Sequence, residues 1–231
     1  SYFNTGDYEN AAYHFADYIK KNPKNKRLSD AKLRLADSYF GSKNYSAASK
    51  VYQELFTADA KLSTDPYARY QYAQALYKSG KTNEAINEFR SIQEKFPNSE
   101  YAEVSLYTIG WIHFQKKEYS QAIDQYNNVI SKYPKTKLEP IIYYSIGDAY
   151  FNMEKYDLAI ENYEKVISQF PSSQYVFDAV TGIQYSYVAK GDPEKAVSFL
   201  DEFVSKNPSL SYADQLMFKK SEIYYSLRQY D

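Results

Sequence analysis

The 231-residue chain contains no cysteine and only seven glycines. The lack of cysteine excludes disulfide bonds and thiolate chemistry. The small number of glycines disfavours a fold of strands and tight turns, because average glycine usage is already about 7%. A run of roughly 20 apolar residues, which a membrane-spanning helix needs, is also missing, so we expect no direct membrane insertion by this segment.

A surplus of charge of one sign is missing as well. The chain has 28 basic and 29 acidic residues, for a formal net charge of -1. Such a balance gives no broad attraction to nucleic acid or to an anionic membrane surface. We therefore expect protein or peptide partners that are selected by local chemistry, and no nucleic-acid partner.

Residues of common catalytic, metal and cofactor sites are sparse. The two histidines are His14 and His113, and no glycine-rich phosphate loop is present. His113 falls in a column of large residues described below, which favours a packed imidazole. Glu84, Glu118 and Glu161 are expected to be solvent-facing surface charges. We therefore predict a chain that is not an enzyme and has no catalytic residue, cofactor or metal.

The most informative feature that is present is a repeat with a period of 37 residues. One column of this repeat is small: Ala11, Ala48, Ala85, Ala122, Ala159 and Ala196. The column four residues later is large: Phe15, Tyr52, Phe89, Tyr126, Tyr163 and Leu200. Because residues four apart share one face of a helix, these columns predict a helix that packs through a small and a large side chain.

A second helix is expected upstream in each period. Its small column is Ala36, Ala73, Gly110, Gly147, Gln184 and Ser221, and its large column is Tyr39, Leu76, His113, Tyr150, Tyr187 and Tyr224. Turns are expected at Gly6-Asp7, Lys43-Asn44, Gly80-Lys81 and Gly191-Asp192, and helix ends at Pro23, Pro97, Pro134, Pro171 and Pro208, with Ala60 replacing proline once. Each period therefore reads as helix A, a turn and helix B.

These columns resemble the tetratricopeptide repeat family. One copy of the family signature reads Ile146, Gly147, Tyr150, Ala159, Tyr163 and Pro171. The family's usual repeat of 34 residues is three shorter, and the extra residues fall in the loop between hairpins. The resemblance implies an all-α fold, a right-handed α-solenoid of stacked antiparallel helix hairpins, with helix A on the inner surface and helix B outside.

We expect a single array over residues 1–231 with about six hairpins. Its units are a partial repeat at 1–23 with a complete helix B, then 24–60, 61–97, 98–134, 135–171 and 172–208, and a partial repeat at 209–231 with helix A. Tyr2 and Phe3 match the end of a helix A, and Tyr230 matches the start of a helix B. We therefore expect an excerpt of a longer array, whose apolar ends (Tyr2, Phe3, Phe218, Tyr224 and Tyr225) could associate end to end.

Two loops carry a more specific resemblance. Residues 96–102 (FPNSEYA) and 170–175 (FPSSQY) resemble loops of bacterial cell-envelope tetratricopeptide proteins, such as the outer-membrane assembly lipoprotein and the Tol-Pal coordinator. Ser99 and Ser173 are predicted to cap the N-termini of the following helices. This resemblance implies a periplasmic or outer-membrane-associated location, with the cytoplasm as the alternative.

The family resemblance also implies which residues line the inner groove. Three columns of helix A are expected there: Leu33, Tyr70, Tyr107, Tyr144, Thr181 and Phe218; Asp37, Gln74, Trp111, Asp148, Tyr185 and Glu222; and Phe40, Tyr77, Phe114, Phe151, Val188 and Tyr225. For the third column, packing against the neighbouring hairpin is the favoured alternative to partner contact. The candidate partner-binding residues are Tyr70, Gln74, Tyr77, Tyr107, Trp111, Phe114, Tyr144, Asp148, Phe151 and Tyr185.

The sequence therefore predicts a non-catalytic protein-protein interaction scaffold that binds a partner segment in an aromatic groove, in cell-envelope assembly or secretion. A clamp for the carboxylate tail of a chaperone is disfavoured, because that ligand set needs lysine, arginine and asparagine at these positions. Two alternatives remain open. The rings, with Gln74, Gln115 and Asp148, would also suit a glycan or peptidoglycan strand, and the array would also serve as the regulatory arm of a larger enzyme.

Overall fold

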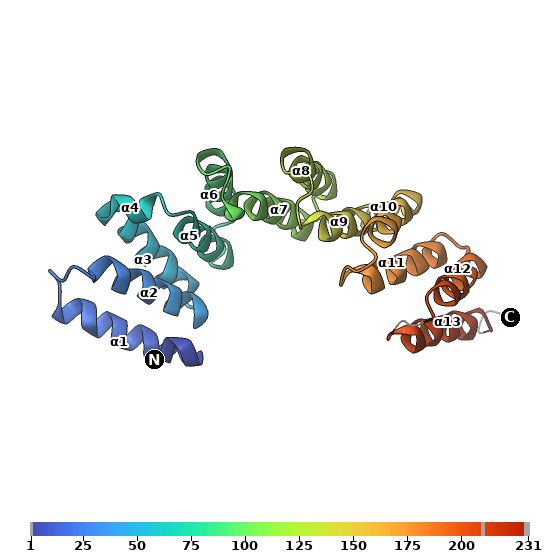
Figure 1. Cartoon of the computed structure of the whole chain (residues 1–231), viewed down its shortest axis with the longest axis horizontal. Helices are drawn as coiled ribbons and strands as arrows, with labels where there is room; N and C mark the ends of the chain where they lie inside the picture. The colour runs from blue at the N-terminus through green and yellow to red at the C-terminus, as the bar shows by residue number, and fades with distance from the viewer. Residues whose placement is uncertain (1, 209–210, 229–231) are drawn as a thin grey trace. The chain divides into compact units, whose positions relative to one another are not determined.

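The computed structural model describes residues 2–208 and 211–228. Within these ranges the ordered elements are all helical (Figure 1). The chain divides into two compact units, residues 1–109 and residues 110–231. The expected start of a helix B at Tyr230 lies outside the described residues, as do the first two residues of the predicted repeat at 209–231.

The first unit is a stack of helices that pack in chain order. Its elements are η1 (Tyr2–Thr5), α1 (Tyr8–Lys21), α2 (Leu28–Gly41), α3 (Tyr45–Ala58), α4 (Ala60–Ser63), α5 (Pro66–Lys78) and α6 (Thr82–Lys95). Each long helix contacts the next, and α2 also contacts α5, so successive A helices meet. Helix α7 (Glu100–Gln115) runs across the boundary between the units.

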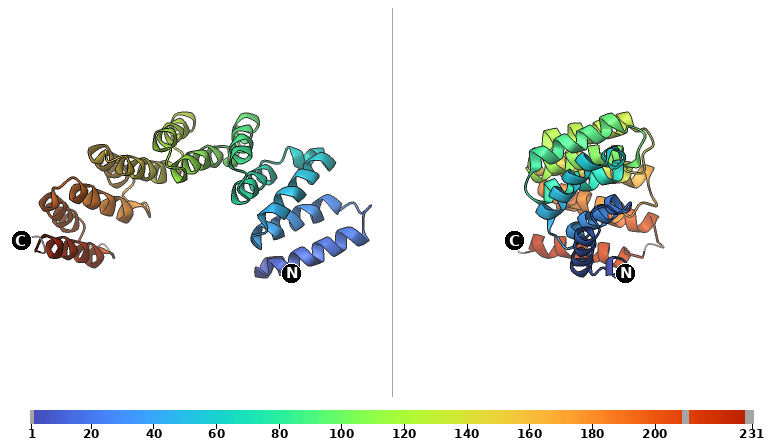
Figure 2. Two further views of the ribbon diagram at one scale, coloured as in Figure 1. Left: turned by 180° about the vertical axis from the view of Figure 1, so that it is seen from behind. Right: turned by 90° about the vertical axis from the view of Figure 1, so that its left-hand side faces the viewer.

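The second unit repeats this arrangement. Its elements are α8 (Tyr119–Lys132), α9 (Glu139–Asn152), α10 (Tyr156–Gln169), α11 (Val176–Ala189), α12 (Pro193–Lys206) and α13 (Ala213–Arg228). Each of these helices packs on the next, and α9 also contacts α11. Figure 2 shows consecutive helices lying side by side within each unit.

The first and last residues of the B helices follow the predicted period. In the described part of the chain, the B helices begin at Tyr8, Tyr45, Thr82, Tyr119, Tyr156 and Pro193, and they end at Lys21, Ala58, Lys95, Lys132, Gln169 and Lys206. Both series advance by one period of 37 residues each time. The predicted all-α solenoid of helix hairpins is therefore confirmed.

The turn from helix A to helix B has one conformation throughout. Each of these turns contains a residue with positive φ, between 60° and 86°: Gly6, Lys43, Gly80, Lys117, Glu154 and Gly191. Lys135, in the loop after α8, also has a positive φ, of 65°. The left-handed region costs a residue with a Cβ more than it costs glycine. The hairpin geometry therefore overrides local preference at the two lysines and the glutamate of these turns.

The loop at residues 59–65 differs from the other loops between hairpins, because Ala60 replaces the proline that follows helix B elsewhere. An extra helical turn, α4, forms here. Asp59 caps it by accepting hydrogen bonds from the backbone N–H groups of Lys61 at 3.0 Å and Leu62 at 3.3 Å. Alanine keeps the backbone donor and the flexibility that proline lacks, so the chain is free to start this turn.

Of the two predicted serine caps, one is confirmed and one is wrong. Ser99 directly precedes α7, and its Oγ accepts from the backbone N–H of Tyr101 at 3.2 Å. Ser173 makes the equivalent bond to Tyr175 at 3.2 Å, but α11 starts only at Val176, after Tyr175 in the cap position. The Ser173 hydroxyl therefore stabilises the turn before the helix.

Small residues of helix A create the space for large rings of helix B. A Cβ added to Gly147 would lie 2.5 Å from the Tyr163 ring, and one added to Gly182 would lie 2.6 Å from the same ring. Gly110 is related in the same way to Tyr126, at 2.7 Å. These glycines, together with the fully buried alanine column of helix B, let neighbouring helices approach closely around each ring.

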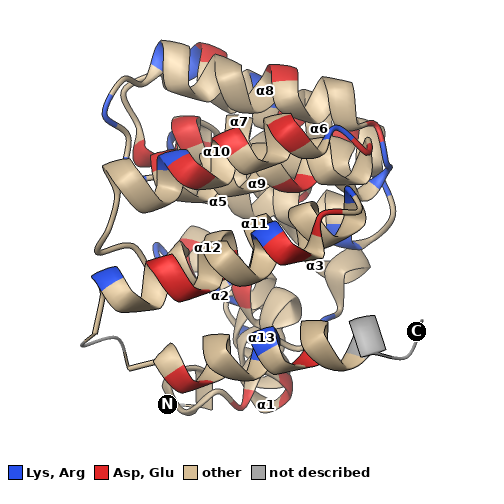
Figure 3. Ribbon diagram, turned by 90° about the vertical axis from the view of Figure 1, so that its right-hand side faces the viewer, with Lys and Arg blue, Asp and Glu red and all other residues tan. Residues whose placement is uncertain are grey.

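The two kinds of helix differ in polarity. Helices α10 and α12 carry acidic and basic residues along their ribbons in Figure 3, and their apolar side chains face the core. Helices α9 and α11 contain few charges because they have neighbours on more than one side. None of the described helices is long and apolar enough to cross a membrane.

Candidate functional site

The candidate partner-binding residues lie on the A helices at positions of partial exposure. All of them are half-buried except Tyr185, which is 46% exposed. Tyr70, Gln74, Tyr77 and Tyr107 belong to the first unit. The remaining candidates belong to the second: Trp111, Phe114, Tyr144, Asp148, Phe151 and Tyr185.

In the first unit, Tyr70 and Gln74 form one local group on α5. The Gln74 amide Nε2 donates a 2.8 Å hydrogen bond to the Tyr70 hydroxyl. The Tyr70 ring lies 5.6 Å from the Phe89 ring and 5.4 Å from the Tyr101 ring, measured between centroids. These contacts hold the Tyr70 ring in one orientation while part of it stays exposed.

In the second unit, Tyr144 and Asp148 form the matching group on α9. The Asp148 carboxylate accepts a 2.6 Å hydrogen bond from the Tyr163 hydroxyl and also interacts with the Tyr144 hydroxyl. The Tyr144 ring stacks on the Tyr175 ring, with centroids 6.1 Å apart. Burial raises the pKa of Asp148 above its usual value, and the two tyrosine hydroxyls oppose this shift.

The third candidate column packs inside its own hairpin. Phe114 meets Tyr119 edge to face at 5.4 Å, and Phe151 meets Tyr156 in the same way at 5.5 Å. The contact recurs between Phe40 and Tyr45 at 5.2 Å. These contacts lie within one hairpin, so packing of this column against the neighbouring hairpin stays a prediction. The phenylalanines keep only part of each ring in solvent.

One group that the candidate residues did not include lies at Asp37 on α2. This side chain is buried, and its carboxylate accepts a 2.5 Å hydrogen bond from the Tyr52 hydroxyl. Burial raises the pKa of Asp37, although Tyr52 and Arg34 act in the opposite direction. The sequence signal was available, because Asp37 and Tyr52 stand three periods before Asp148 and Tyr163.

The last two A helices expose more of their apolar side chains. The Tyr185 hydroxyl accepts a 3.2 Å hydrogen bond from the Lys219 ammonium, which also lies 5.6 Å from the centre of the Tyr185 ring. Phe218 and Tyr225 on α13 are 66% and 67% exposed. Basic and aromatic groups are therefore adjacent at Tyr185.

His113 is half-buried, as its column predicts, but Glu118 is not an ordinary surface charge. The His113 Nδ1 lies 2.7 Å from Glu118 Oε2, and Lys116 Nζ lies 2.6 Å from Glu118 Oε1. The hydrogen bond from Lys116 and the one from His113 lower the pKa of Glu118. Glu84 and Glu161 are exposed and pair with neighbouring lysines, as expected.

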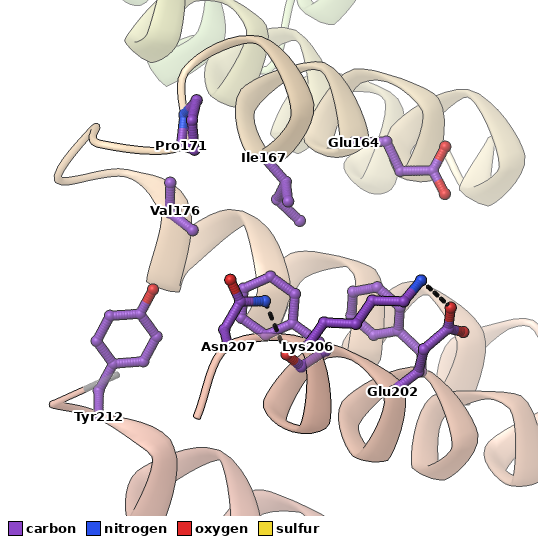
Figure 4. Close-up of a pocket in the computed structure, with 10 residues that line it drawn as sticks. Glu164, Ile167, Pro171, Val176, Glu202, Lys206, Asn207 and Tyr212 are labelled. Carbon is purple, nitrogen blue, oxygen red and sulfur yellow. Dashed lines mark hydrogen bonds and ion pairs between the residues drawn. The ribbon is translucent and has the colours of Figure 1, made fainter. Parts of the chain in front are cut away.

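No group of three or more potential metal ligands occurs within the described part of the chain. A pocket of about 360 Å³ lies between α10 and α12 in the second unit (Figure 4). Its walls include Ile167, Phe199 and Phe203, and the Glu202–Lys206 ion pair lies at its edge. None of the candidate partner-binding residues lines this pocket.

Three family models match the chain. Two are models of the tetratricopeptide repeat, at residues 1–25 and 140–173, and the third describes an outer membrane lipoprotein (YfiO), at residues 62–155. The chain belongs to the tetratricopeptide repeat family. No curated protein matches it.

Solved structures with the tetratricopeptide fold resemble the chain at low identity. A tetratricopeptide repeat protein from Parabacteroides merdae ATCC 43184 has a TM-score of 0.65 and 15% identity, covering 97% of this chain and 83% of the other. PilF of Pseudomonas aeruginosa has a TM-score of 0.60 and 16% identity, covering 95% and 93%. MamA from Desulfovibrio magneticus RS-1 has a TM-score of 0.59 and 20% identity, covering 79% and 97%. At such identities these likenesses show the fold.

Proposed function

We propose that this tetratricopeptide repeat protein is a non-catalytic scaffold that binds a segment of a partner protein along its A helices. The supporting observation is the partial exposure of aromatic rings on helices that also carry buried core residues. On α9, Ile146 and Ala149 are buried, whereas Tyr144 and Phe151 on the same helix keep part of each ring in solvent. Rings that are held rigidly and remain partly exposed are effective anchors for a partner.

A protein segment suits this surface better than a sugar strand. Glycan binding needs amide and carboxylate groups that are available to sugar hydroxyls. The Gln74 amide already donates to the Tyr70 hydroxyl, so this group is engaged within the protein. The exposed parts of the site are mainly aromatic, which favours apolar or aromatic side chains of a peptide or helix.

The proposed setting is assembly or secretion in the bacterial cell envelope, at a periplasmic or outer-membrane-associated location. The outer membrane lipoprotein model that matches residues 62–155 supports this setting, as do the loops at 96–102 and 170–175. Fractionation of cells that produce the native protein is the direct check. Recovery with the cytoplasmic fraction after osmotic release of the periplasm would contradict the proposed location.

The binding proposal is tested by capture of partners from an envelope extract. The test variant combines Tyr107→Ala, Trp111→Ala and Tyr144→Ala, and we expect it to retain less than a tenth of the captured partner. The matched control removes apolar groups of helix B that are exposed, with Tyr13→Ala and Leu158→Ala. Circular dichroism verifies that both variants are folded. Equal capture by the test variant and the wild type would disprove the aromatic surface as the binding site.

A further inference from the structure

A small, partly polar cavity opens on the A helices of the first unit. It has a volume of about 170 Å³, and its walls include the rings of Phe3, Phe40, Tyr52 and Tyr67 around the carboxylate of Asp37. Pockets for drug-sized ligands are larger, at about 300–1,000 Å³. The cavity therefore suits the end of one side chain rather than a whole small molecule.

The charge of Asp37 is only partly compensated within the protein. Its side chain is 5% exposed, yet Arg34, a cation beside it, reaches Oδ2 only at 3.5 Å and is itself 53% exposed. Hydrogen bonds from Tyr52 and Tyr67 supply the remaining contacts. A buried carboxylate in such surroundings gains free energy when a second cation comes into contact with it.

The walls of the cavity also favour a cation. Aromatic faces attract ammonium and guanidinium groups through the negative charge above the ring. The Arg34 guanidinium lies over the face of Phe3, 5.5 Å from its centre, so a cation at the edge of this cavity already makes such a contact. A carboxylate enclosed by aromatic rings is the combination that recognises alkylammonium groups.

We propose that the Asp37 cavity binds the ammonium group of a lysine side chain of the partner protein. This proposal rests on the proposed function, and it specifies one chemical feature of the segment that the A helices bind. The ammonium contacts the Asp37 carboxylate, while the methylene groups of the lysine lie against the rings of Phe3 and Phe40. Gln71, at the wall of the cavity, offers its amide oxygen as a further acceptor.

The same set of residues recurs three periods later in the second unit. Phe114, Tyr119, Asp148, Phe151 and Tyr163 there correspond to Phe3, Tyr8, Asp37, Phe40 and Tyr52. Asp178 and Gly182 replace Tyr67 and Gln71, and the charge that acts on Asp148 is that of the Asp178 carboxylate. The second unit therefore carries a related acceptor for an ammonium group, with a second carboxylate nearby.

The test compares two small probes on the full chain. N-acetyl-lysine methylamide and N-acetyl-norleucine methylamide have side chains of similar length, but only the first has an ammonium group. We expect the lysine amide to bind at least tenfold more tightly in an NMR titration. Similar dissociation constants for the two amides, within twofold, would overturn the proposal.

Variants connect the binding to the two carboxylates. Asp37→Asn combined with Asp148→Asn is expected to weaken binding of the lysine amide at least tenfold. Asp124→Asn, an exposed aspartate on α8, makes the same kind of change outside the site and should leave binding unaltered. Phe40→Leu keeps the carboxylate and removes one aromatic wall, and we expect binding about threefold weaker. Unaltered binding in the double variant and in Phe40→Leu would also overturn the proposal.

Failure of this inference is distinguishable from failure of the proposed function. If the lysine amide does not bind, but the variant at Tyr107, Trp111 and Tyr144 still loses partner capture, only the lysine site is wrong. If that variant captures the partner like the wild type, the aromatic binding surface itself is wrong.

Discussion

The Tyr163 hydroxyl donates a 2.6 Å hydrogen bond to Asp148 Oδ1, across the contact between α10 and α9. Tyr52 and Asp37 have the same relationship between α3 and α2. Each bond joins helix B to the helix A of the same hairpin, at a point where the carboxylate is shielded from water. The large column of helix B therefore supplies a donor to each of these buried carboxylates.

We expect Tyr163→Phe to lower the free energy of unfolding of the second unit by about 1.5–3 kcal/mol, because the change removes a hydrogen bond from a buried carboxylate. Urea unfolding measured by circular dichroism is suitable. Tyr156→Phe removes a hydroxyl from a half-buried tyrosine of the same helix and serves as the control, with an expected change below about 0.5 kcal/mol. Equal effects of the two variants would show that the bond to Asp148 contributes little.

Burial raises the pKa values of Asp37 and Asp148 above 3.8, the usual value for aspartic acid. The folded chain therefore holds these protons at pH values where the unfolded chain has released them. The contribution of the two groups to stability is present below pH 3.8 and is lost as pH rises through the folded pKa values.

Asp37→Asn combined with Asp148→Asn should remove this component and reduce the fall in stability over that range. Thermal unfolding between pH 3.5 and 7 is the measurement, with Asp124→Asn as the control for a lost surface carboxylate. Parallel pH profiles for the wild type and the double variant would contradict the expectation. The groups whose charges or hydrogen bonds act on these carboxylates are Arg34, Tyr52, Asp65 and Tyr67 at Asp37, and Tyr144, Tyr163 and Asp178 at Asp148.

The left-handed turn residues offer a third test. Lys43→Gly, Lys117→Gly and Glu154→Gly should each stabilise the chain by about 0.5–1 kcal/mol, because glycine adopts positive φ without a steric penalty. The reverse change, Gly80→Ala, should destabilise by about 1 kcal/mol. Lys50→Gly, in the interior of α3, controls for the flexibility that glycine adds to the unfolded chain and should cost about 1 kcal/mol. Equal losses at Lys43 and Lys50 would contradict this account of the turn.

Close packing between Gly147 and the Tyr163 ring gives a fourth prediction. Gly147→Ala places a Cβ 2.5 Å from that ring and should destabilise the second unit by about 1–3 kcal/mol. The same change should cost less stability in a Tyr163→Leu background, because leucine has no ring for the added Cβ to meet. Leucine is accepted in this column at position 200. A double-mutant cycle from denaturant titrations measures the coupling. If the effects of Gly147→Ala and Tyr163→Leu on stability are additive, the added Cβ is accommodated by a shift of the backbone and not by the Tyr163 ring.

Much of the fold can be predicted from the columns of small and large residues in the 37-residue repeat. Ala159 and Tyr163 are predicted to share a core face, and both are buried. The limits of every helix B follow from the period, because the same turn and the same stop recur at constant distance. Sequence reasoning fails where the period is interrupted. Ala60 indicates a missing proline, but whether the chain then extends or winds into α4 depends on the capping geometry of Asp59.

The sequence predicts less of the candidate site than of the fold. Phe114 and Tyr144 belong to helix A columns that the family resemblance places in the groove. How much of each ring is exposed depends on which aromatic rings of the following helix pack against it. The sequence places Asp37 and Asp148 in one groove column but does not reveal the bond of either to a tyrosine, and Asp37 is not among the candidate residues. Both carboxylates pair with a residue of a different helix, and such a pairing is a property of distance in space.

By itself, the sequence determined the repeat, the order of helices A and B and the residues that form the core, because periodic patterns of side-chain size specify which faces of a helix can pack. Only the tertiary structure decided how deeply Asp37 and Asp148 are buried, which hydroxyls bond to them and which rings enclose a cavity. Burial and cavity shape arise from the joint approach of three or more helices. No single helix encodes that approach in its own pattern.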